Sequence, residues 1–469
     1  MNSTLYSLIG LAAGVAFILA LKGLSHPKTA RRGNLIGAFG ATLATLSVFL
    51  YVTPSRGEEV GHDLPLHNFW WIVGAIAVGL VIGVPAARKV EMTQMPQLVA
   101  LFNGVGGGAA ALVAIVEYLN LGAEATTAEV IFTVFTVVVG CVSFSGSIIT
   151  FMKLQELMTT RPVVFPGGRF VIAGTLVAVL GVSVWVVAAL GTTPLMVLAA
   201  LSLIFGVLFV LPVGGADVPI VISLLNAFTG LTVAASGYVL SSTLLIIAGT
   251  LVGASGTILT RLMAEAMGRS LFGTLFGAFT AKPQEASGSA EERPVRSGSA
   301  DDVAILLNYA RRVVIVPGFG LAVAQAQHTV RELADLMLSK GIDVAYGIHP
   351  VAGRMPGHMN VLLAEANVPY DQLAEMDEVN PTFGQTDVAI VIGANDVVNP
   401  AAQTTPGCPI YGMPILEVNH AANIIFLKRS MRPGFAGIEN ELLYDPKTML
   451  LFGDAKASLT KVVSALKAL

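Results

Sequence analysis

Ala281–Ala300 reads AKPQEASGSAEERPVRSGSA, and this stretch divides the chain into two parts of different character. Proline, serine, glycine and charged residues at such density are typical of a linker between folded units. The residues before it are strongly apolar and almost free of charge, whereas those after it mix apolar runs with charge, as soluble domains do. We therefore predict a membrane domain over residues 1–270, a linker over 271–300 and a soluble domain over 301–469.

The composition of the whole chain also indicates a membrane protein. Hydrophobic residues make up 54% of the 469 residues and charged residues only 12%, whereas soluble proteins have about a quarter charged residues. The net charge of -3 leaves no basic surface for a nucleic acid. Only two cysteines occur, Cys141 and Cys408, so we expect no disulfide framework and no metal site, and redox chemistry must come from a cofactor.

Nine stretches of the first part are apolar enough to cross a membrane, which takes about 20 residues each. They lie near residues 5–22, 34–52, 69–86, 96–118, 129–151, 170–190, 194–212, 217–238 and 242–262. The first has no basic residue ahead of it and no small-residue cleavage site, so we interpret it as a retained span and not as a signal peptide. The sequence thus predicts an all-α membrane bundle of about nine transmembrane helices.

Basic residues collect in alternate loops between these stretches. These loops hold Lys22, Lys28, Arg31 and Arg32, then Arg88 and Lys89, then Lys153, Arg161 and Arg169, and finally Arg261 and Arg269. The loops between them hold only Arg56, offset by Glu58, Glu59 and Asp63. Because cytoplasmic loops carry the excess of lysine and arginine, we predict an external amino terminus and a cytoplasmic soluble domain.

Several polar side chains lie inside or at the ends of the predicted spans, where they are costly and often mark a pathway. They include Asn103, Ser143, Ser145, Ser147, Asp217 and Asn226. For the serines, packing is the favoured interpretation, since small residues let helices approach and hydroxyls bond their own helix. For Asn103 and Asn226, packing and pathway both stay open. No span contains a histidine, so a proton route would need Glu117, Asp217, water held by amides, or a partner.

The second part alternates strand-like and helix-like segments. Residues 312–317 are typical of a buried parallel strand, and a turn from Gly318 leads into a helix that we expect to run to about Ser339. Further strand-like runs lie at residues 344–348, 388–392, 424–427 and 449–452. This alternation predicts a Rossmann-like, doubly wound parallel sheet.

The glycines after the first strand partly match a dinucleotide fingerprint. Gly318 permits a tight turn and Gly320 lets a pyrophosphate approach the backbone, with helix amides beyond. The third glycine is replaced by Val323, so the motif is incomplete and a purely structural turn stays open.

Other strand ends carry polar loops of the kind that build sites in open sheets. The second strand ends at residues 347–350 without the carboxylate that NAD-specific folds use, so a 2′-phosphate would not be repelled. Lys428, Arg429 and Ser430 supply two cations and a hydroxyl, which suit a phosphate, although a solvated strand end is the alternative. We expect Gly434 and Gly437 to form a lid.

Two further loops, residues 349–358 and 393–400, also follow predicted strands. Asp396 in the second loop is a candidate functional carboxylate, and an Asx-turn residue with no other role is the alternative, which stays open.

Together these motifs resemble those of the beta subunits of proton-translocating NAD(P) transhydrogenases. The resemblance rests on residues 317–327, 349–358, 375–381, 393–400 and 428–430, and on 90–96 and 214–219 in the membrane part. It implies hydride exchange between NADP(H) on this chain and NAD(H) on a partner alpha subunit, coupled to proton translocation across the lipid bilayer. We therefore expect a multi-pass protein of a bacterial inner membrane, assembled as a dimer of heteromers.

The resemblance also implies residue roles. Lys428, Arg429 and Ser430 would hold the 2′-phosphate, and the Gly318 turn and the Arg354 loop would hold the pyrophosphate. Asp396, the expected catalytic residue, would link nucleotide state to the membrane. The full set expected at the cofactor is Gly318, Phe319, Gly320, Ala322, Val323, His349, Val351, Ala352, Gly353, Arg354, Met355, Pro356, Gly393, Asn395, Asp396, Lys428, Arg429, Ser430, Gly434 and Phe435.

One position departs from the family. Well-known members carry a histidine where this chain has Asn103, and an amide does not exchange a proton at ordinary pH. Either the titrating group lies on the partner's spans, or water held by Asn103, Ser147 and Asn226 conducts. With Asp217, these residues form the expected proton path.

A secondary transporter or channel with a nucleotide-sensing domain is the alternative function. The predicted spans lack the paired broken helices and the charged site at mid-membrane that such transporters use.

Overall fold

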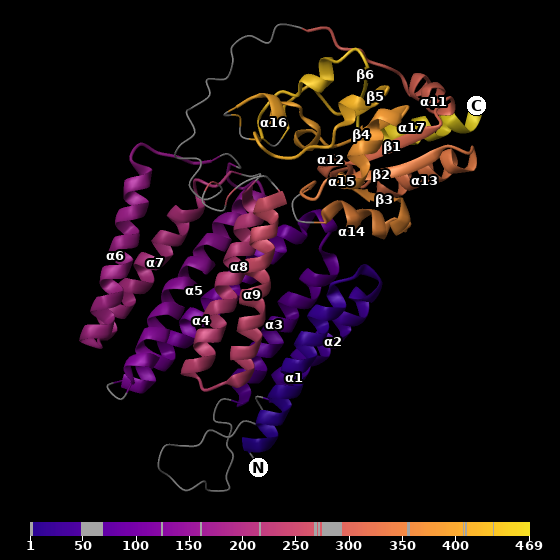
Figure 1. Ribbon diagram of the computed structural model, residues 1–469. Helices are drawn as coiled ribbons and strands as arrows, with labels where there is room; N and C mark the ends of the chain where they lie inside the picture. Colours follow the sequence, from indigo (N-terminus) through magenta and orange to yellow (C-terminus); the bar gives the residue numbers. More distant parts are fainter. Residues whose placement is uncertain are drawn as a thin grey trace.

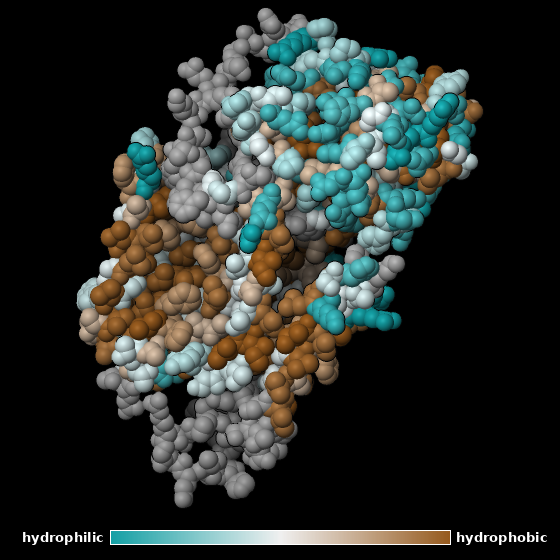
Figure 2. Space-filling model, viewed as in Figure 1, coloured by the Kyte–Doolittle hydropathy of each residue, from teal (hydrophilic) through white to brown (hydrophobic). Residues whose placement is uncertain are grey.

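The computed structural model describes residues 3–47, 69–122, 125–159, 162–214, 217–266, 270, 273, 293–353, 357–406, 408, 410–434 and 436–469. Figure 1 shows a bundle of long helices with an α/β domain at one end. In Figure 2 the bundle surface is mostly hydrophobic and the α/β domain is mostly hydrophilic, which is the contrast expected between lipid-facing and water-facing parts.

Within the described residues, seven helices are long and apolar enough to cross a membrane. They are α3 (Phe69–Lys89), α4 (Met95–Leu121), α5 (Thr127–Leu154), α6 (Gly168–Ala189), α7 (Thr192–Val210), α8 (Val218–Val239) and α9 (Thr243–Ala266). These helices coincide with the third to the ninth predicted spans.

The count of nine spans is not confirmed. The first predicted span lies in α1 (Ser3–Leu24), and the part of it whose side chains are described, Leu8–Leu24, is shorter than the seven spanning helices. The second begins in α2 (Pro27–Ser47), and its residues 48–52 lie outside the described part. The described part of α2 includes the cations Arg31 and Arg32, and that part does not qualify as a span.

Glycine lets the bundle helices approach closely. Helix α5 packs against α4, α7 and α8. A Cβ on Gly107 of α4 would lie 2.9 Å from the Ser143 Cβ of α5, and one on Gly249 of α9 would overlap the backbone of Ala234 in α8. Larger residues would therefore separate these helices.

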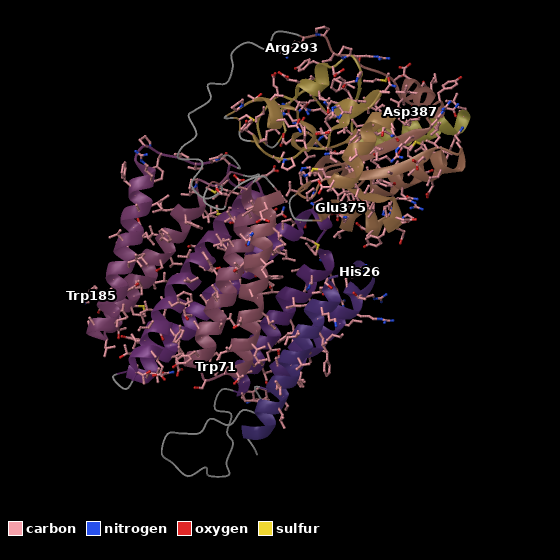
Figure 3. The ribbon with its side chains drawn as sticks, viewed as in Figure 1. His26, Trp71, Trp185, Arg293, Glu375 and Asp387 are labelled. Carbon is pink, nitrogen blue, oxygen red and sulfur yellow. The ribbon has the colours of Figure 1, made fainter. Side chains whose placement is uncertain are left out.

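The outer helices differ from α5. None of the residues of α3 is buried within the described part of the chain. Figure 3 places Trp71 and Trp185 on the bundle, away from the α/β domain, and both side chains are exposed. Exposed tryptophans on apolar helices are typical of a membrane interface.

The α/β domain is built on one six-stranded, all-parallel sheet in the order β3-β2-β1-β4-β5-β6. The strands are β1 (Arg312–Pro317), β2 (Asp343–Ile348), β3 (Leu373–Glu375), β4 (Val388–Ile392), β5 (Asn423–Lys428) and β6 (Thr448–Phe452). The predicted parallel sheet is confirmed, although β3 was not predicted. The strand order reverses between β1 and β4, and such switch points are where open parallel sheets form ligand crevices.

The two faces of the sheet carry separate hydrophobic cores. Val313 and Ile315 of β1 join one core, and Val314 and Val316 join the other, because successive strand residues point to opposite faces. The first core also includes apolar residues of α11 (Ala300–Asn308), α12 (Phe319–Val323), α13 (Gln327–Ser339), α14 (His358–Glu365) and α17 (Ala455–Ala468).

Shorter elements complete the described chain. They are η2 (Met92–Gln94), η6 (Tyr370–Gln372), α15 (Met376–Val379), η7 (Asn380–Gln385), η8 (Asp396–Val398), α16 (Ala401–Thr404), η9 (Val418–His420) and η10 (Glu441–Tyr444).

The helix after β1 is not continuous, so the prediction of one helix to about Ser339 was wrong. It divides into α12 and α13, and Gln325 between them has a left-handed φ of 48°. A residue in that conformation interrupts the helical hydrogen bonds.

The last residues of the predicted linker join the sheet. Ser297 pairs with Leu450 of β6, Gly298 N donates to the Leu450 carbonyl at 3.0 Å, and Leu450 N donates to the Arg296 carbonyl at 2.8 Å. Figure 3 shows Arg293 beside this domain. Residues 271–272 and 274–292 of the predicted linker lie outside the described part.

Candidate nucleotide site

Two glycine loops meet where β1 and β4 end. Gly318 N donates to the Ile392 carbonyl at 2.9 Å, and Gly320 N donates to the Gly393 carbonyl at 2.9 Å. A Cβ on Gly320 would lie 2.7 Å from the Gly393 Cα, so glycine is needed for the contact between the loops. The sequence pattern predicted that Gly320 lets a pyrophosphate approach the backbone. The contact with Gly393 is a second reason for a glycine at this position.

A cavity of about 850 Å³ opens beside these loops. The predicted cofactor residues that line it are Gly318, Phe319, Gly320, Val323, Val351, Ala352, Gly353, Gly393, Asn395, Asp396, Lys428, Arg429, Ser430 and Gly434. Ala322 and His349 are buried and do not line it. Arg354, Met355, Pro356 and Phe435 lie outside the described residues. The structure thus gathers loops that lie more than a hundred residues apart in the chain.

Other lining residues were missed from the sequence. They are Ala324, Ala394, Val397, Ile410, Met413, Leu427, Arg432, Pro433, Gly453, Asp454 and Ala455. Arg432 follows Ser430 by two positions, so its charge was a usable signal. Gly453 and Asp454 follow the predicted strand 449–452, and the rule that sites form at strand ends would have found them.

A polar network joins the loops after β4 and β5. Lys428 Nζ donates to Asn395 Oδ1 at 3.0 Å and to the Arg432 carbonyl at 3.1 Å. Asn395 Nδ2 donates to Asp396 Oδ1 at 3.0 Å. Burial lowers the pKa of the half-buried Lys428 ammonium, and the negative charge of Asp396 opposes this shift. The loop after β4 therefore holds one of the two cations in place.

The segment after β5 folds over the Asp396 loop. Ala436 N donates to Asp396 Oδ2 at 2.9 Å, and Asn440 Nδ2 donates to the Asn395 carbonyl at 3.0 Å. A side chain on Gly434 would collide with the side chains of Asn395 and Asp396. The Asp396 carboxylate thus bonds a distant amide, Ala436 N, instead of capping its own turn, so the Asx-turn interpretation was wrong.

His349 holds the loop after β2. Its Nε2 donates to the Pro414 carbonyl at 2.7 Å, and its Nδ1 accepts from Val351 N at 3.2 Å. Burial lowers the pKa of His349, and its bond to the Pro414 carbonyl opposes this. The neutral ring therefore links Pro414 to Val351 and holds Val351 at the cavity.

The cavity has a floor of membrane-helix residues. Leu154 and Glu156 at the end of α5, Pro219 of α8 and Met263 of α9 line it together with the sheet loops. Val351 packs against a buried cluster of Ile220, Met263 and Ala264. Nothing in the sequence marked the membrane-helix residues Leu154, Pro219 and Met263 as neighbours of the site.

A buried polar cluster joins α4, α5 and α8 deeper in the bundle. Asn103 Nδ2 donates to Ser147 Oγ at 2.9 Å and lies 3.4 Å from Ser143 Oγ. Ser143 Oγ donates to the Leu225 carbonyl at 2.9 Å and lies 2.5 Å from Thr229 Oγ1. The structure therefore brings together Asn103 and Ser147, two residues of the predicted proton path.

The other polar residues of the predicted path lie differently. Asn226 is half-buried in α8, next to Leu225. Asp217 is buried at the start of α8, about 12 Å along the helix axis from Leu225 at 1.5 Å per residue. Ser145 Oγ bonds the Cys141 carbonyl of its own helix at 3.0 Å, which is the packing role.

All of the cations assigned to loops that fall within the described residues lie in helices, namely Lys22, Lys28, Arg31, Arg32, Arg88, Lys89, Lys153, Arg169 and Arg261. Arg161 and Arg269 lie outside the described residues. Lys153 is buried in the last turn of α5, and Arg261 lies within α9, where its Nε is 2.7 Å from Glu265 Oε1. Helix α5 runs past the apolar stretch that was predicted to end near residue 151, because a helix can continue past the end of its apolar segment. Arg261 already lies within the predicted stretch 242–262.

Comparison with known proteins finds matches over nearly the whole chain. A family model described as NAD(P) transhydrogenase beta subunit matches residues 6–465. NAD(P) transhydrogenase subunit beta of Rhodospirillum rubrum is 47% identical over 465 residues, which cover 97% of this chain and 98% of the relative. A second sequence of that name from the same species gives the same values.

Proposed function

The chain belongs to the family of NAD(P) transhydrogenase beta subunits, and from this premise we propose that the cavity at the sheet is its NADP(H) site. Family membership makes the chain a multi-pass membrane subunit of NAD(P) transhydrogenase with an alpha-subunit partner. The observation that carries the NADP(H) assignment is Lys428, Arg429 and Ser430 at the cavity, at the carboxyl end of β5. Two cations and a hydroxyl suit a 2′-phosphate, which NAD lacks.

Each wall of the cavity has a binding task in this proposal. Lys428, Arg429 and Ser430 hold the 2′-phosphate, and the Gly318 loop and the loop of residues 349–358 hold the pyrophosphate. The nicotinamide supplies the hydride chemistry, so the protein needs only to position it and to exclude water. Asp396 acts as a positioning residue, since its carboxylate holds Ala436 over the loop after β4.

The floor of membrane-helix residues under the cavity implies that the α/β domain takes two positions. Hydride transfer requires the nicotinamide to meet NAD(H), which we assign to the alpha subunit. Met263 and Val351 line the cavity on the membrane side, and Val351 packs against the cluster that includes Met263 in this structure. We infer that the domain alternates between the membrane helices and the alpha subunit, and that the two positions differ in affinity for NADP⁺ and NADPH.

A cross-link tests this alternation. Met263→Cys with Val351→Cys, joined by a short bifunctional thiol reagent, should reduce steady-state hydride exchange by about tenfold or more. Each single cysteine treated with the same reagent is the control. Unchanged exchange in the cross-linked protein would show that the domain works in the position seen here.

The polar cluster is the proposed membrane route for the proton. Asn103 does not titrate, so we propose that water held by Asn103, Ser147 and Asn226 carries the proton toward Asp217. Moving one charge through about 100 mV releases roughly 2.3 kcal/mol, which is enough to bias a near-balanced hydride exchange by more than tenfold. We further propose a bacterial inner membrane, an external amino terminus and a dimer of heteromers, which the loop charges and the family support.

The proposed domain boundaries separate proton conduction from nucleotide binding. We propose a proton-conducting domain over residues 1–270, a linker over 271–300 and a cytoplasmic NADP(H)-binding domain over 301–469. The bonds of Arg296 and Gly298 to Leu450 support counting the last linker residues with the cytoplasmic domain.

The decisive experiment measures hydride exchange by the complete enzyme. Membranes that contain this chain and its alpha subunit should reduce an NAD analogue with NADPH, and an uncoupler should change the rate. The same membranes without the alpha subunit are the control. Bound NADP with no hydride exchange in the complete complex would contradict the proposal and would favour a nucleotide-sensing transporter.

A further inference from the structure

Lys153 is a buried cation that the nucleotide site and the proposed proton route do not use. Its side chain is 1% exposed in the last turn of α5. Its Nζ donates to the carbonyl oxygens of Val210 at 3.2 Å, Leu211 at 2.6 Å and Val213 at 2.7 Å. The three N–H groups of an ammonium are thereby matched by three acceptors. Among the described residues, no carboxylate pairs with it.

The acceptors lie at the carboxyl end of α7 and in the turn after it. The last carbonyls of a helix have no donor within the helix and form the negative end of its dipole. Lys153 supplies that donor and a positive charge from a different helix, α5. A methionine would fill a similar volume but would remove three donors, and the buried Val213 carbonyl would lose the donor that Lys153 supplies. The Val210 and Leu211 carbonyls would keep the bonds from Val213 N and Val163 N, each at 3.1 Å.

The turn that Lys153 holds leads directly to the cavity floor. Val163 N, from the connection between α5 and α6, donates to the Leu211 carbonyl at 3.1 Å. Asp217 N donates to the Gly214 carbonyl at 3.0 Å, just before α8 begins. Leu154, next to Lys153, and Pro219 of α8 both line the cavity. Lys153 therefore joins α5 directly to the turn after α7, and the Leu211 carbonyl joins that turn to the connection between α5 and α6.

Helix α5 also carries the polar cluster. Ser147, which accepts from Asn103, precedes Lys153 by six residues and so lies about 9 Å away along the helix axis. A displacement of α5 at the polar cluster would move Lys153, and through its bonds the turn between α7 and α8.

We propose that Lys153 is a positioning residue that keeps the turn between α7 and α8 in register with α5, and so couples the polar cluster to the floor of the nucleotide cavity. The inference rests on the proposed function. It places the coupling in hydrogen bonds between helix ends and adds no titrating group to the proton route.

The test compares Lys153→Met with Lys153→Arg in the complete enzyme. One measurement is single-turnover hydride transfer from bound NADPH to an NAD analogue, and the other is the number of protons pumped into vesicles per hydride. We expect Lys153→Met to leave the single turnover within about twofold and to lower protons per hydride by about tenfold, the scale of a typical coupling energy. Lys153→Arg keeps the charge and the donors, and it should restore most of the pumping.

Arg261→Met is the matched control, because it removes an exposed cation from α9 whose partner is a nearby surface carboxylate. It should change neither measurement. Normal pumping by Lys153→Met would overturn the inference, and so would an equal loss of both measurements, which would indicate a purely structural role. If Lys153→Met does not accumulate in the membrane, Lys153→Gln takes its place with the same expected outcomes. Absence of hydride transfer in the unsubstituted complex would instead contradict the proposed function.

Discussion

The α/β domain and the helical bundle both use glycine for close contact, but they place charge differently. In the domain, Gly320 and Gly393 bring two loops together at a cavity that contains Lys428 and the carboxylate of Asp396. In the bundle, Gly107 and Gly140 bring α4 and α5 together beside a neutral cluster of amide and hydroxyl groups. Near water, opposite charges can lie together at low cost, whereas this cluster inside the bundle consists of uncharged amide and hydroxyl groups.

Lys153 lies at the boundary between these two patterns. It is a cation in the bundle, yet its acceptors are helix-end carbonyls and not carboxylates. The bundle thus stabilises its buried charge with backbone dipoles, and the domain holds Lys428 with side chains. The comparison predicts that replacing a close-contact glycine disturbs the packing of either part. Replacing a charged side chain should instead change one function and leave the packing intact.

The largest effect is expected at Gly393. Its φ is +68° and a Cβ there would overlap the backbone of Gly320 and Leu321, so Gly393→Ala should separate the two loops. We expect the free energy of unfolding of the domain to fall by about 3 kcal/mol and most bound NADP(H) to be lost. Thermal unfolding and nucleotide retention measure this. Gly384→Ala is the control, because Gly384 has open space around it, and equal behaviour of the two variants would refute the close-contact argument.

The second effect separates charge from shape in the cavity. Lys428→Ala with Arg429→Ala should weaken NADP binding by about a hundredfold or more and NAD binding much less, since bonds to charged groups are worth about 1.5–3 kcal/mol each. Binding of both nucleotides is measured by titration. Lys456→Ala with Lys461→Ala removes two cations from α17 that do not line the cavity. Equal weakening of both nucleotides would show that Lys428 and Arg429 do not recognise the phosphate.

The sequence predicted the α/β domain better than it predicted the contact between that domain and the bundle, and the reasons are physical. Five strands of the sheet are continuous apolar runs, such as Val388–Ile392, and were found, whereas Leu373–Glu375 has three residues and no apolar run. The break at Gln325 has no glycine or proline to mark it. Strand ends must meet at one edge of a parallel sheet, so much of the site followed from the predicted strands.

The floor of the cavity did not follow from the sequence. Pro219 and Met263 are ordinary residues of apolar helices, and their closeness to the sheet loops depends on how the two parts dock. Lys153 was assigned to a loop because the apolar stretch ends near residue 151, although α5 continues to Leu154. Lys153 is buried because α5 packs against the end of α7, and no local sequence pattern indicates that contact.

The third effect tests the neutral cluster of the bundle. Asn103→Leu removes the donor to Ser147 Oγ and should lower proton pumping by about tenfold, while single-turnover hydride transfer at the α/β domain continues. Vesicle pumping and rapid-mixing absorbance measure the two steps. Ser145→Ala is the control, since Ser145 bonds only its own helix. Intact pumping in Asn103→Leu would exclude that side chain from the proton route.

The smallest effect concerns the protonation of Lys428. Burial holds its pKa below the ordinary lysine value of 10.5, so the cation is lost at a lower pH than for an exposed lysine. As pH rises through that lowered pKa, the protein loses a positive charge that the 2′-phosphate needs, and NADP affinity should fall a few-fold while NAD affinity stays constant. Arginine remains charged throughout this range, so titrations of Lys428→Arg should show a flat NADP affinity. If the unsubstituted protein were equally flat, Lys428 would not contact the phosphate, and the charge selectivity of the cavity would rest on Arg429 alone.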